Sequence, residues 1–490
     1  MRAALPLVLA LLLAAHAEAQ SLRLGSVDFP NSGAAEAQED FLQGVLLLHS
    51  FEYGPAAEAF RRARSEDPDF ALAHWGEAMS YNHPLWQEQD RTTARGVLAV
   101  FTGDAPTERE AMYLQAVSAL YGEGSKSERD RSYMEAMRRL HEAYPDDPEA
   151  RAFYALSILG LTDGERDFGN YMLAAATAQP VLDANPEHPG AAHYIIHSFD
   201  DPIHAPLGLP AARAYGSIAP DAAHAQHMTS HIFVAMGMWD DVIRANVNAT
   251  RVQDAARVRN GAAPNSCGHY SSWLAYGYLM TETQDSADVL MDRCQASQAD
   301  PDPDDRAYYA AMRARHVIDT EDWPAARQWA FDVSDHPWAH RTYTFATAFA
   351  ALREGDLTGG RLLVEELRPG SASDPRLRIQ QMELDALLLV TEGNVEGAVA
   401  LLTEAVGLEE SLPFEFGPPA SLKPPHELLG EVLLAAGESE EAVDAFRGSL
   451  EMTPGRVPSL RGLARAAAEA GMGELAESTR RRVEAITGGS

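Results

Sequence analysis

Histidines are concentrated in the middle of the chain, where seven of the 17 fall between residues 193 and 269. Within this set, one pair is spaced by four residues and one trio by three and four, so each group would share one face of a helix. Helix faces of this kind bring imidazole nitrogens to one metal ion. We therefore predict a metal site built from His193, His197, His227 and His231, with His204, His224 and His269 around them.

The residue types favour a transition metal. Imidazole suits copper, zinc and iron alike, so the metal stays open among these three. The segment 193–197 has the spacing of a zincin helix, but Tyr194 occupies the position of the glutamate that would act as the base, which disfavours a zincin protease. Asp200 and Asp201 follow directly and are expected to ligate the ion or to orient an imidazole, with Tyr194 as a further assisting residue.

The histidines also admit other interpretations. A metal-free ligand groove, a packed polar core and a noncovalent heme site all remain open, although the chain has no Cys-x-x-Cys-His attachment motif. His49, His74 and His83 form a looser N-terminal group, and whether they reach the central site depends on the curvature of the chain. If the site is catalytic, a vacant coordination position would activate water or dioxygen. The sequence indicates neither a reaction nor a substrate.

Internal repeats predict the elements that carry these residues. Offsets of 12, 4, 3 and 5 residues separate small, aromatic and proline positions near the N-terminus, at Gly44, Ala56, Phe60, Ala63 and Pro68. The same pattern recurs near the C-terminus at Gly430, Leu433, Ala442, Phe446 and Pro454. Small residues allow two helices to cross closely, a large apolar residue fills the next gap, and proline ends the second helix.

These residues resemble the tetratricopeptide repeat (TPR) superfamily over most of residues 36–485. A narrower resemblance, to exported bacterial-type TPR proteins with a histidine-rich central region, rests on residues 31–33, 49–53, 75–79 and 82–86. The first resemblance implies an all-α solenoid of antiparallel helical hairpins, about ten by repeat length. Neither implies an activity. The alternative to a metal site is therefore a non-enzymatic scaffold that binds a peptide or a partner protein in its groove.

The repeat frame divides the chain. We expect a signal peptide at 1–19, an N-terminal segment at 20–35, a solenoid at 36–410, a Pro-rich loop at 411–425 and C-terminal repeats at 426–490. Inserted loops are expected near 82–90, 163–168, 200–210 and 412–425, where Pro, Gly and aromatic residues interrupt the repeats. Counting back from the second helices places the central histidines on three successive first helices, which would form neighbouring walls of one concave groove.

The N-terminus and the charge bear on location and partners. Arg2, the apolar run 5–15 and the small residues Ala17 and Ala19 are typical of a cleaved secretory signal, which predicts a periplasmic or secreted protein. No later apolar run is long enough to span a bilayer, so no membrane insertion is expected after cleavage. The formal net charge of -33 disfavours binding to nucleic acid.

The two cysteines fall at the ends of one expected hairpin. Cys267 precedes a first helix and Cys294 lies near the end of its antiparallel partner, so the two side chains should be neighbours. In an oxidising compartment they would form a disulfide. The alternative is that Cys267, two residues before His269, is a soft ligand for copper or zinc.

Overall fold

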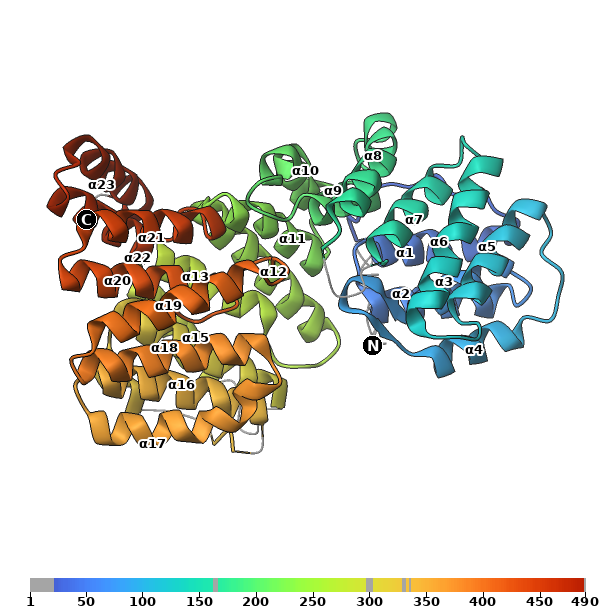
Figure 1. Ribbon diagram of the computed structural model, residues 1–490. Helices are drawn as coiled ribbons and strands as arrows, with labels where there is room; N and C mark the ends of the chain where they lie inside the picture. Colours follow the sequence, from blue (N-terminus) through green and yellow to red (C-terminus); the bar gives the residue numbers. More distant parts are fainter. Residues whose placement is uncertain (1–21, 162–165, 297–302, 328–331, 335, 489–490) are drawn as a thin grey trace, which may run out of the picture.

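The computed structural model describes residues 22–161, 166–296, 303–327, 332–334 and 336–488, and within these ranges the chain is almost entirely helical (Figure 1). The N-terminal elements are η1 (Ala35–Ala37), α1 (Gln38–His49), α2 (Tyr53–Glu66), α3 (Ala71–Met79), β1 (Asn82–His83), η2 (Pro84–Trp86), β2 (Glu88–Gln89), α4 (Arg91–Val100), α5 (Glu108–Leu120), α6 (Lys126–Ala143), α7 (Pro148–Leu159) and α8 (Phe168–Ala184). The short strands β1 and β2 pair antiparallel within the expected insertion at 82–90.

Six helices form the middle of the molecule: α9 (Pro189–Ser198), α10 (Ala205–Ile218), α11 (Ala223–Ala235), α12 (Trp239–Arg259), α13 (His269–Met280) and α14 (Gln284–Ala296). The remaining elements are α15 (Pro303–Thr320), η3 (Trp323–Arg327), α16 (Pro337–Arg353), α17 (Leu357–Leu367), η4 (Arg368–Ala372), α18 (Pro375–Thr391), α19 (Val395–Glu410), α20 (Pro425–Ala436), α21 (Ser439–Met452), α22 (Val457–Glu469) and α23 (Gly473–Thr487). The all-α solenoid of helical hairpins predicted from the sequence is confirmed.

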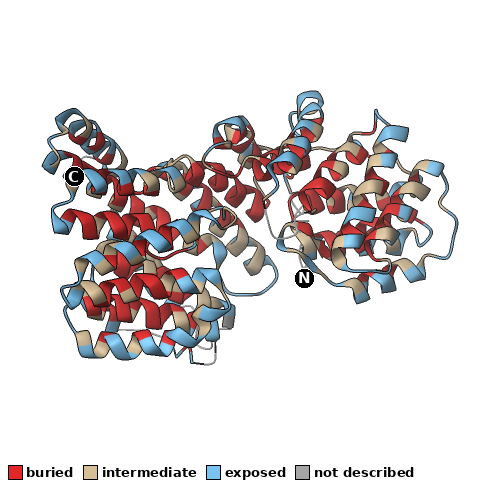
Figure 2. Ribbon diagram, in the orientation of Figure 1, coloured by how far each residue is buried: buried red, intermediate tan, exposed pale blue. Residues whose placement is uncertain are grey.

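The packing inside the hairpins follows the repeat pattern. Phe60 is fully buried, and a Cβ atom added to Gly44 or Gly76 would lie 2.8 or 2.3 Å from its ring. Phe446 has the same relation to Gly430 and Gly462, at 2.9 and 2.3 Å. Glycine therefore lets the helices on both sides of each phenylalanine approach closely. Figure 2 shows the resulting layers, with buried residues on the facing sides of the helices and exposed residues on the outside.

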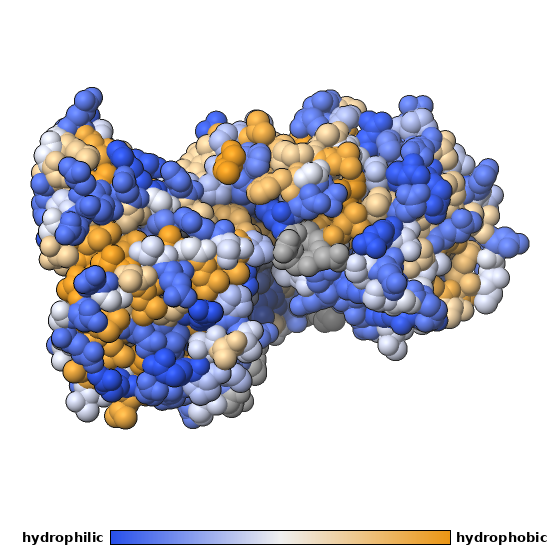
Figure 3. All heavy atoms as spheres, in the orientation of Figure 1, coloured by the Kyte–Doolittle hydropathy of each residue, from blue (hydrophilic) through white to orange (hydrophobic). Residues whose placement is uncertain are grey.

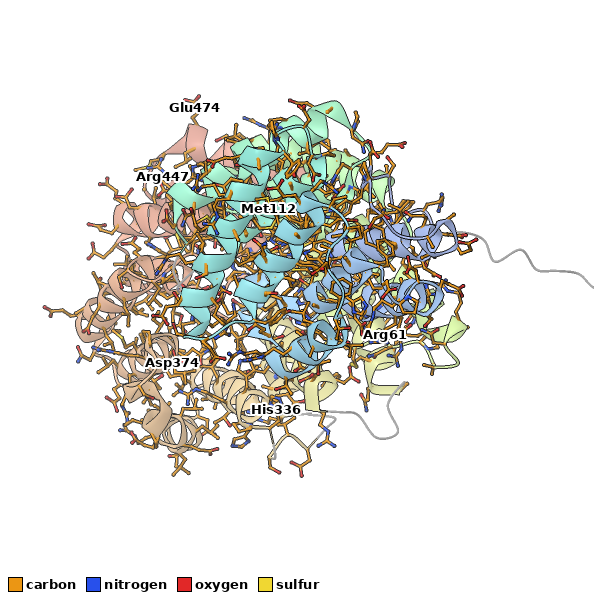
Figure 4. The ribbon with its side chains drawn as sticks, turned by 90° about the vertical axis from the view of Figure 1, so that its right-hand side faces the viewer. Arg61, Met112, His336, Asp374, Arg447 and Glu474 are labelled. Carbon is orange, nitrogen blue, oxygen red and sulfur yellow. A yellow bond between two sulfur atoms is a disulfide. The ribbon has the colours of Figure 1, made fainter. Side chains whose placement is uncertain are left out.

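The C-terminal repeats fold back onto the middle of the chain. Trp239 at the start of α12 donates its indole N–H to the carbonyl of Gly455, 2.8 Å away, and Arg461 of α22 forms an ion pair with Glu282. Arg447 and Glu474 mark the outer edge of these repeats, where their side chains point into solvent (Figure 4). Hydrophilic residues cover much of the face in Figure 3, in keeping with the acidic composition.

Two of the expected loops differ from the structure. The segment 200–210 is a loop only as far as residue 204, because α10 begins at Ala205. Pro206 lies in the first turn of this helix, where the missing N–H of proline would have no partner within the helix, and Pro210 lies one turn further on. Of the segment 163–168, residues 163–165 lie outside the described residues and α8 begins at Phe168. Residues 411–424 join α19 to α20 without a helix, as expected. No helix in the described ranges has the length and apolar character needed to cross a bilayer.

Candidate metal centre

Three helices carry the central histidines. His193 and His197 lie on α9, the trio from His224 to His231 lies on α11, and His269 is the first residue of α13. These helices are the three successive first helices that the repeat frame indicated. Each start is fixed locally: α9 begins after His188, whose Nδ1 accepts the amide of Ala191 at 3.0 Å. The backbone N–H of His224 near the start of α11 donates to Oε1 of Glu52 at 3.0 Å.

Six of the seven predicted histidines come together in two adjacent groups. His193, His197 and His224 form one group, which we call the 193 triad, and His227, His231 and His269 form the other, which we call the 227 triad. In each triad, one nitrogen from every ring lies within 4.8 Å of the corresponding nitrogens of the other two. The imidazoles therefore converge instead of pointing to separate places.

Hydrogen bonds on the outer side of the 227 triad set the protonation of its rings. The Nδ2 of Asn246 donates to the carbonyl of Val242, so Oδ1 faces Nδ1 of His227 at 2.7 Å. An amide oxygen can only accept, so Nδ1 of His227 carries the proton and Nε2 presents a lone pair. Nδ1 of His231 lies 2.5 Å from Oδ2 of Asp200 and donates to that carboxylate in the same way.

Hydrogen bonds among the inner nitrogens of the 227 triad cannot satisfy all three rings. Nε2 of His227 lies 3.2 Å from Nε2 of His231 and 3.0 Å from Nε2 of His269. Its single lone pair cannot accept from both neighbours. One cation between the three nitrogens would satisfy them all, and two nitrogens about 2.0 Å from a tetrahedral ion are about 3.3 Å apart. The two separations from Nε2 of His227 are thus close to those expected between two ligands of one ion.

The 193 triad has a similar inner face. Nδ1 of His193 donates to the carbonyl of His49 at 2.7 Å, so its Nε2 presents a lone pair, and this atom lies 3.1 Å from Nε2 of His197. The Nε2 of His224 is buried and has no hydrogen-bond partner. An unpaired buried imidazole nitrogen loses its interaction with water without compensation. A cation at this triad would supply the missing partner.

The triads are buried, which corrects the expectation of an open groove. His193 and His227 are fully buried, and of the six rings only His269 belongs to an exposed residue. Phe51 covers the 193 triad, with its ring 4.2 Å from that of His193, and adopts a left-handed backbone conformation (φ 54°) that bulky residues rarely take. Trp273 lies 4.5 Å from the ring of His231 and covers the 227 triad. Aromatic side chains thus cover both triads, and His269 is the ring that belongs to an exposed residue.

Burial keeps the imidazoles neutral and able to bind a metal. Removal from water lowers the pKa of His193 to about 3, and the nearby His231 lowers it further. The same cause lowers the pKa of His197, His224 and His227 well below the ordinary value. Although His269 reaches the surface, removal of its ring from water and the nearby His231 lower its pKa to about 4. A neutral ring is the form that ligates metal ions, so these sites need not release protons to bind one at neutral pH.

Three predicted site residues lie elsewhere than expected or have other partners. His204 is outside both triads, because its Nδ1 pairs with Asp201 at 2.9 Å and its ring packs on Phe168. Asp201 also pairs with Arg166 at 3.3 Å, so it does not reach the triads. Tyr194 points away from them and its hydroxyl lies 2.8 Å from Nδ1 of His49. Only Asp200 has a direct link to a triad, through His231.

A third group, His49, Glu149 and His188, was not singled out from the sequence. Glu149 accepts from Nε2 of His49 at 2.7 Å and from Nε2 of His188 at 3.2 Å. The remaining ring nitrogens accept from Tyr194 and from the amide of Ala191, so every polar atom is matched without an ion. Burial raises the pKa of Glu149, but His188 and His49 outweigh it and lower this pKa to about 2. We call this the Glu149 cluster and assign it a structural role.

The other N-terminal histidines do not join the centre. His74 faces backbone carbonyls of Pro68 and Val97, and His83 pairs with Glu88 and stacks on Tyr53. His49 contributes only its backbone carbonyl, which accepts from His193. The N-terminal histidines are therefore linked to the 193 triad through the main chain of His49, which lies 144 positions before His193 in the sequence. No local sequence signal could indicate this contact.

Cys267 and Cys294 form a disulfide. The bond closes the hairpin of α13 and α14, and one of its cysteines, Cys267, lies two residues before His269 in the sequence. A sulfur in a disulfide is not a thiolate, so in this structure Cys267 is not a metal ligand. The bond instead fixes the segment from which His269 enters the 227 triad.

No protein-family model and no curated protein sequence matches the chain. Similar solved structures include yeast Tom70, which is 14% identical with a TM-score of 0.37 over 89% of this chain and 90% of that one. Others are the APC/C hetero-tetramer Cut9-Hcn1 (11%, TM-score 0.34, 94% and 75%) and the P58(IPK) TPR domain (12%, TM-score 0.23, 89% and 99%). The TPR-like fold is evident from the helical hairpins of the chain itself, and the similarity to these structures is not needed to recognise it.

Proposed function

We propose that this chain is an exported TPR-like protein that binds a transition-metal ion at the 227 triad. The observation that carries the proposal is the position of His227, whose Nε2 has one lone pair and lies within 3.2 Å of two other imidazole nitrogens. Asp200 and Asn246 hold two of the rings from the outside, an arrangement that metal-ligating histidines commonly have. The fourth position of a tetrahedral ion would remain for a small ligand.

Export is part of the proposal. It is supported by Arg2, the apolar run 5–15 and the small residues before position 20, which together have the character of a cleaved signal. The disulfide between Cys267 and Cys294 suits an oxidising compartment. Mass spectrometry of the mature protein tests this point, because cleavage after Ala19 should give a chain that begins at Gln20. A secreted or periplasmic fraction that retains Met1 would contradict it.

Elemental analysis of protein purified without an affinity tag tests the metal site. We expect at least one copper, zinc or iron ion per chain, and loss of the ion from the 227 triad in a His227→Ala/His231→Ala variant. The matched control is His74→Ala, which removes a buried histidine that faces backbone carbonyls outside both triads and should leave the metal content unchanged. The absence of stoichiometric metal in the wild-type protein would overturn the proposal.

A second candidate function is binding of a peptide or partner protein, and one cavity favours it. A cavity of about 560 Å³ lies among α13, α15, α20 and α22, and it is lined by apolar residues together with Asp319, Arg353, Lys423 and Arg461. Mixed charges around an apolar floor suit a polypeptide segment better than a metal ion. Charge reversal at Arg461 should abolish co-purification of such a partner and leave the metal content unchanged, which separates the two functions.

A further inference from the structure

The two triads are neighbours, and rings of different triads are only about 1 Å farther apart than rings within one triad. Ring centroids of His197 and His231, which belong to different triads, are 6.0 Å apart, and those of His224 and His227 are 6.2 Å apart. Within the triads, the corresponding separations are 4.8 Å for His193 and His197 and 5.0 Å for His227 and His231. One ion in each triad would therefore lie within reach of a single small molecule, as in two-metal sites where the ions are about 4 Å apart.

His224 points to the second ion independently of the 227 triad. It is nine-tenths buried, its Nε2 has no partner, and its ring lies 5.1 Å from that of His193. The backbone of His224 is held by Glu52, so its ring is positioned at the junction of the two triads. The Glu149 cluster, built from the same residue types and equally buried, leaves no ring nitrogen unmatched. Outside the triads, His141, His316 and His426 also have a buried Nδ1 without a partner, so the unpaired Nε2 of His224 points to an ion only together with its position beside His193 and His197.

We propose that the two triads form a binuclear copper centre that binds dioxygen between the two ions. This inference rests on the proposed function and adds a second ion, the identity of the metal and the class of substrate.

The donor set favours copper over its rivals. All six inner donors are imidazole nitrogens, and the two neighbouring carboxylates have other contacts, Asp200 with the outer nitrogen of His231 and Glu52 with the backbone N–H of His224. Imidazole donors bind copper most strongly among the first-row divalent ions, whereas paired iron ions in helical proteins use bridging carboxylates. Two cuprous ions add a charge of only +2 to a buried aromatic site, while two divalent ions would add +4, and burial of uncompensated charge is costly.

The redox step balances within the centre. Each cuprous ion gives one electron to dioxygen, both copper ions become cupric, and dioxygen is reduced by two electrons to the oxidation level of peroxide. No proton and no outside reductant enter this step. The chain contributes rings whose tautomers are set by Asn246, Asp200 and the carbonyl of His49, and the side chains of Phe51 and Trp273 pack against rings of the two triads.

The test uses the full mature chain, loaded without oxygen with cuprous ion alone and then exposed to dioxygen. We expect two copper ions per chain, a new absorption band in the near ultraviolet on exposure, and almost no cupric signal in electron paramagnetic resonance because the two unpaired spins couple. One copper ion per chain, or a full mononuclear cupric signal from the wild-type protein, would overturn the inference. This measurement needs no variant and so does not depend on how a variant folds.

Variants separate the failure of this inference from that of the proposed function. His193→Ala/His197→Ala should lower the copper content from two to one per chain, abolish the absorption band and give a mononuclear cupric signal. His74→Ala should retain two ions, because the ring of His74 faces backbone carbonyls outside both triads. If the wild-type protein holds one ion that only His227→Ala/His231→Ala removes, the metal site stands and the binuclear centre falls. If the wild-type protein holds no metal, both proposals fall.

Discussion

Oδ2 of Asp200 lies 2.5 Å from Nδ1 of His231, and this contact joins the loop after α9 to the middle of α11. The carboxylate is almost fully buried and its second oxygen has no partner, so its charge acts mainly on the imidazole. It thereby fixes the proton on Nδ1 and directs the lone pair of Nε2 toward the other rings of the 227 triad. A carboxylate in contact with the outer nitrogen also makes the inner nitrogen more basic.

Asp200→Asn should weaken metal binding. The amide keeps the shape of the side chain but removes the charge that stabilises a metal-bound imidazole, so we expect a loss of affinity of about 10- to 100-fold. Competition with a chromophoric chelator measures it. The control is Asp201→Asn on the adjacent residue, which pairs with Arg166 and His204 and should leave the affinity unchanged. Equal losses in both variants would indicate a general loss of structure.

Acidification should destabilise the metal-free protein. The pKa of His193 is about 3 in the folded chain and about 6.5 in the unfolded chain, so between these values the unfolded state binds more protons. The free energy of unfolding therefore rises with pH in this window and falls as the pH drops below 6.5. From pH 6.5 to pH 5, His193 alone accounts for about 2 kcal/mol, and His197, His224 and His227, whose pKa values burial also lowers, add to it.

Urea unfolding of the chelator-treated protein at pH 7 and pH 5 measures this effect. In a His193→Asn variant, the amide N–H can still donate to the carbonyl of His49 but the side chain no longer titrates. The difference in unfolding free energy between the two pH values should shrink by about 2 kcal/mol in this variant. An unchanged difference would mean that His193 is not held neutral in the folded state.

The sequence predicted the features that depend on local spacing. Intervals of three and four residues placed the histidines of α9 and α11 on common helix faces, and the repeat frame identified the three helices that bring them together. The roles of Gly44 and Phe60 also followed from the repeat pattern, because the same close helix crossing recurs at Gly430 and Phe446. These inferences need only the periodicity of the helix and of the repeat.

The features that were missed depend on contacts across many repeats. His204 shares the histidine-rich segment, but it lies beyond the end of α9, where Asp201 captures its ring. The Glu149 cluster joins residues from α1, α7 and the loop before α9. The division of the central histidines into two triads also depends on the directions of side chains such as those of His227 and His269, which are 42 residues apart in the sequence. Spacing along one helix contains no information about such distances.

Removal of the disulfide should affect both stability and metal binding. Cys267 and Cys294 are 27 residues apart, so a Cys267→Ser/Cys294→Ser variant should lose about 3 to 4 kcal/mol of unfolding free energy, measured with urea in the metal-free state. Because His269 lies two residues after Cys267, its ring should also become less well positioned, and metal affinity should fall. Retention of full affinity in the destabilised variant would show that α13 alone positions His269.

Arg456 should be the most important single charge in the C-terminal repeats. It is fully buried and donates to Glu427 at 2.8 and 3.0 Å and to Asp319 at 2.5 Å, which ties the start of α22 to α20 and α15. Burial raises the pKa of Glu427, but Arg456 and Lys423 outweigh it and hold this pKa well below its usual range, so loss of Arg456 leaves buried carboxylates short of a partner.

Arg456→Met should therefore lower the free energy of unfolding by about 3 to 5 kcal/mol, because breaking a buried ion pair leaves a charge without compensation. The matched control is Arg465→Met on the same helix, which removes an exposed pair with Glu469 and should cost less than about 1 kcal/mol. The contact between Trp239 and Gly455 also holds these repeats against the middle of the chain. A similar loss of unfolding free energy in both variants would show that the exposed face of α22 matters as much as the buried charge at its start.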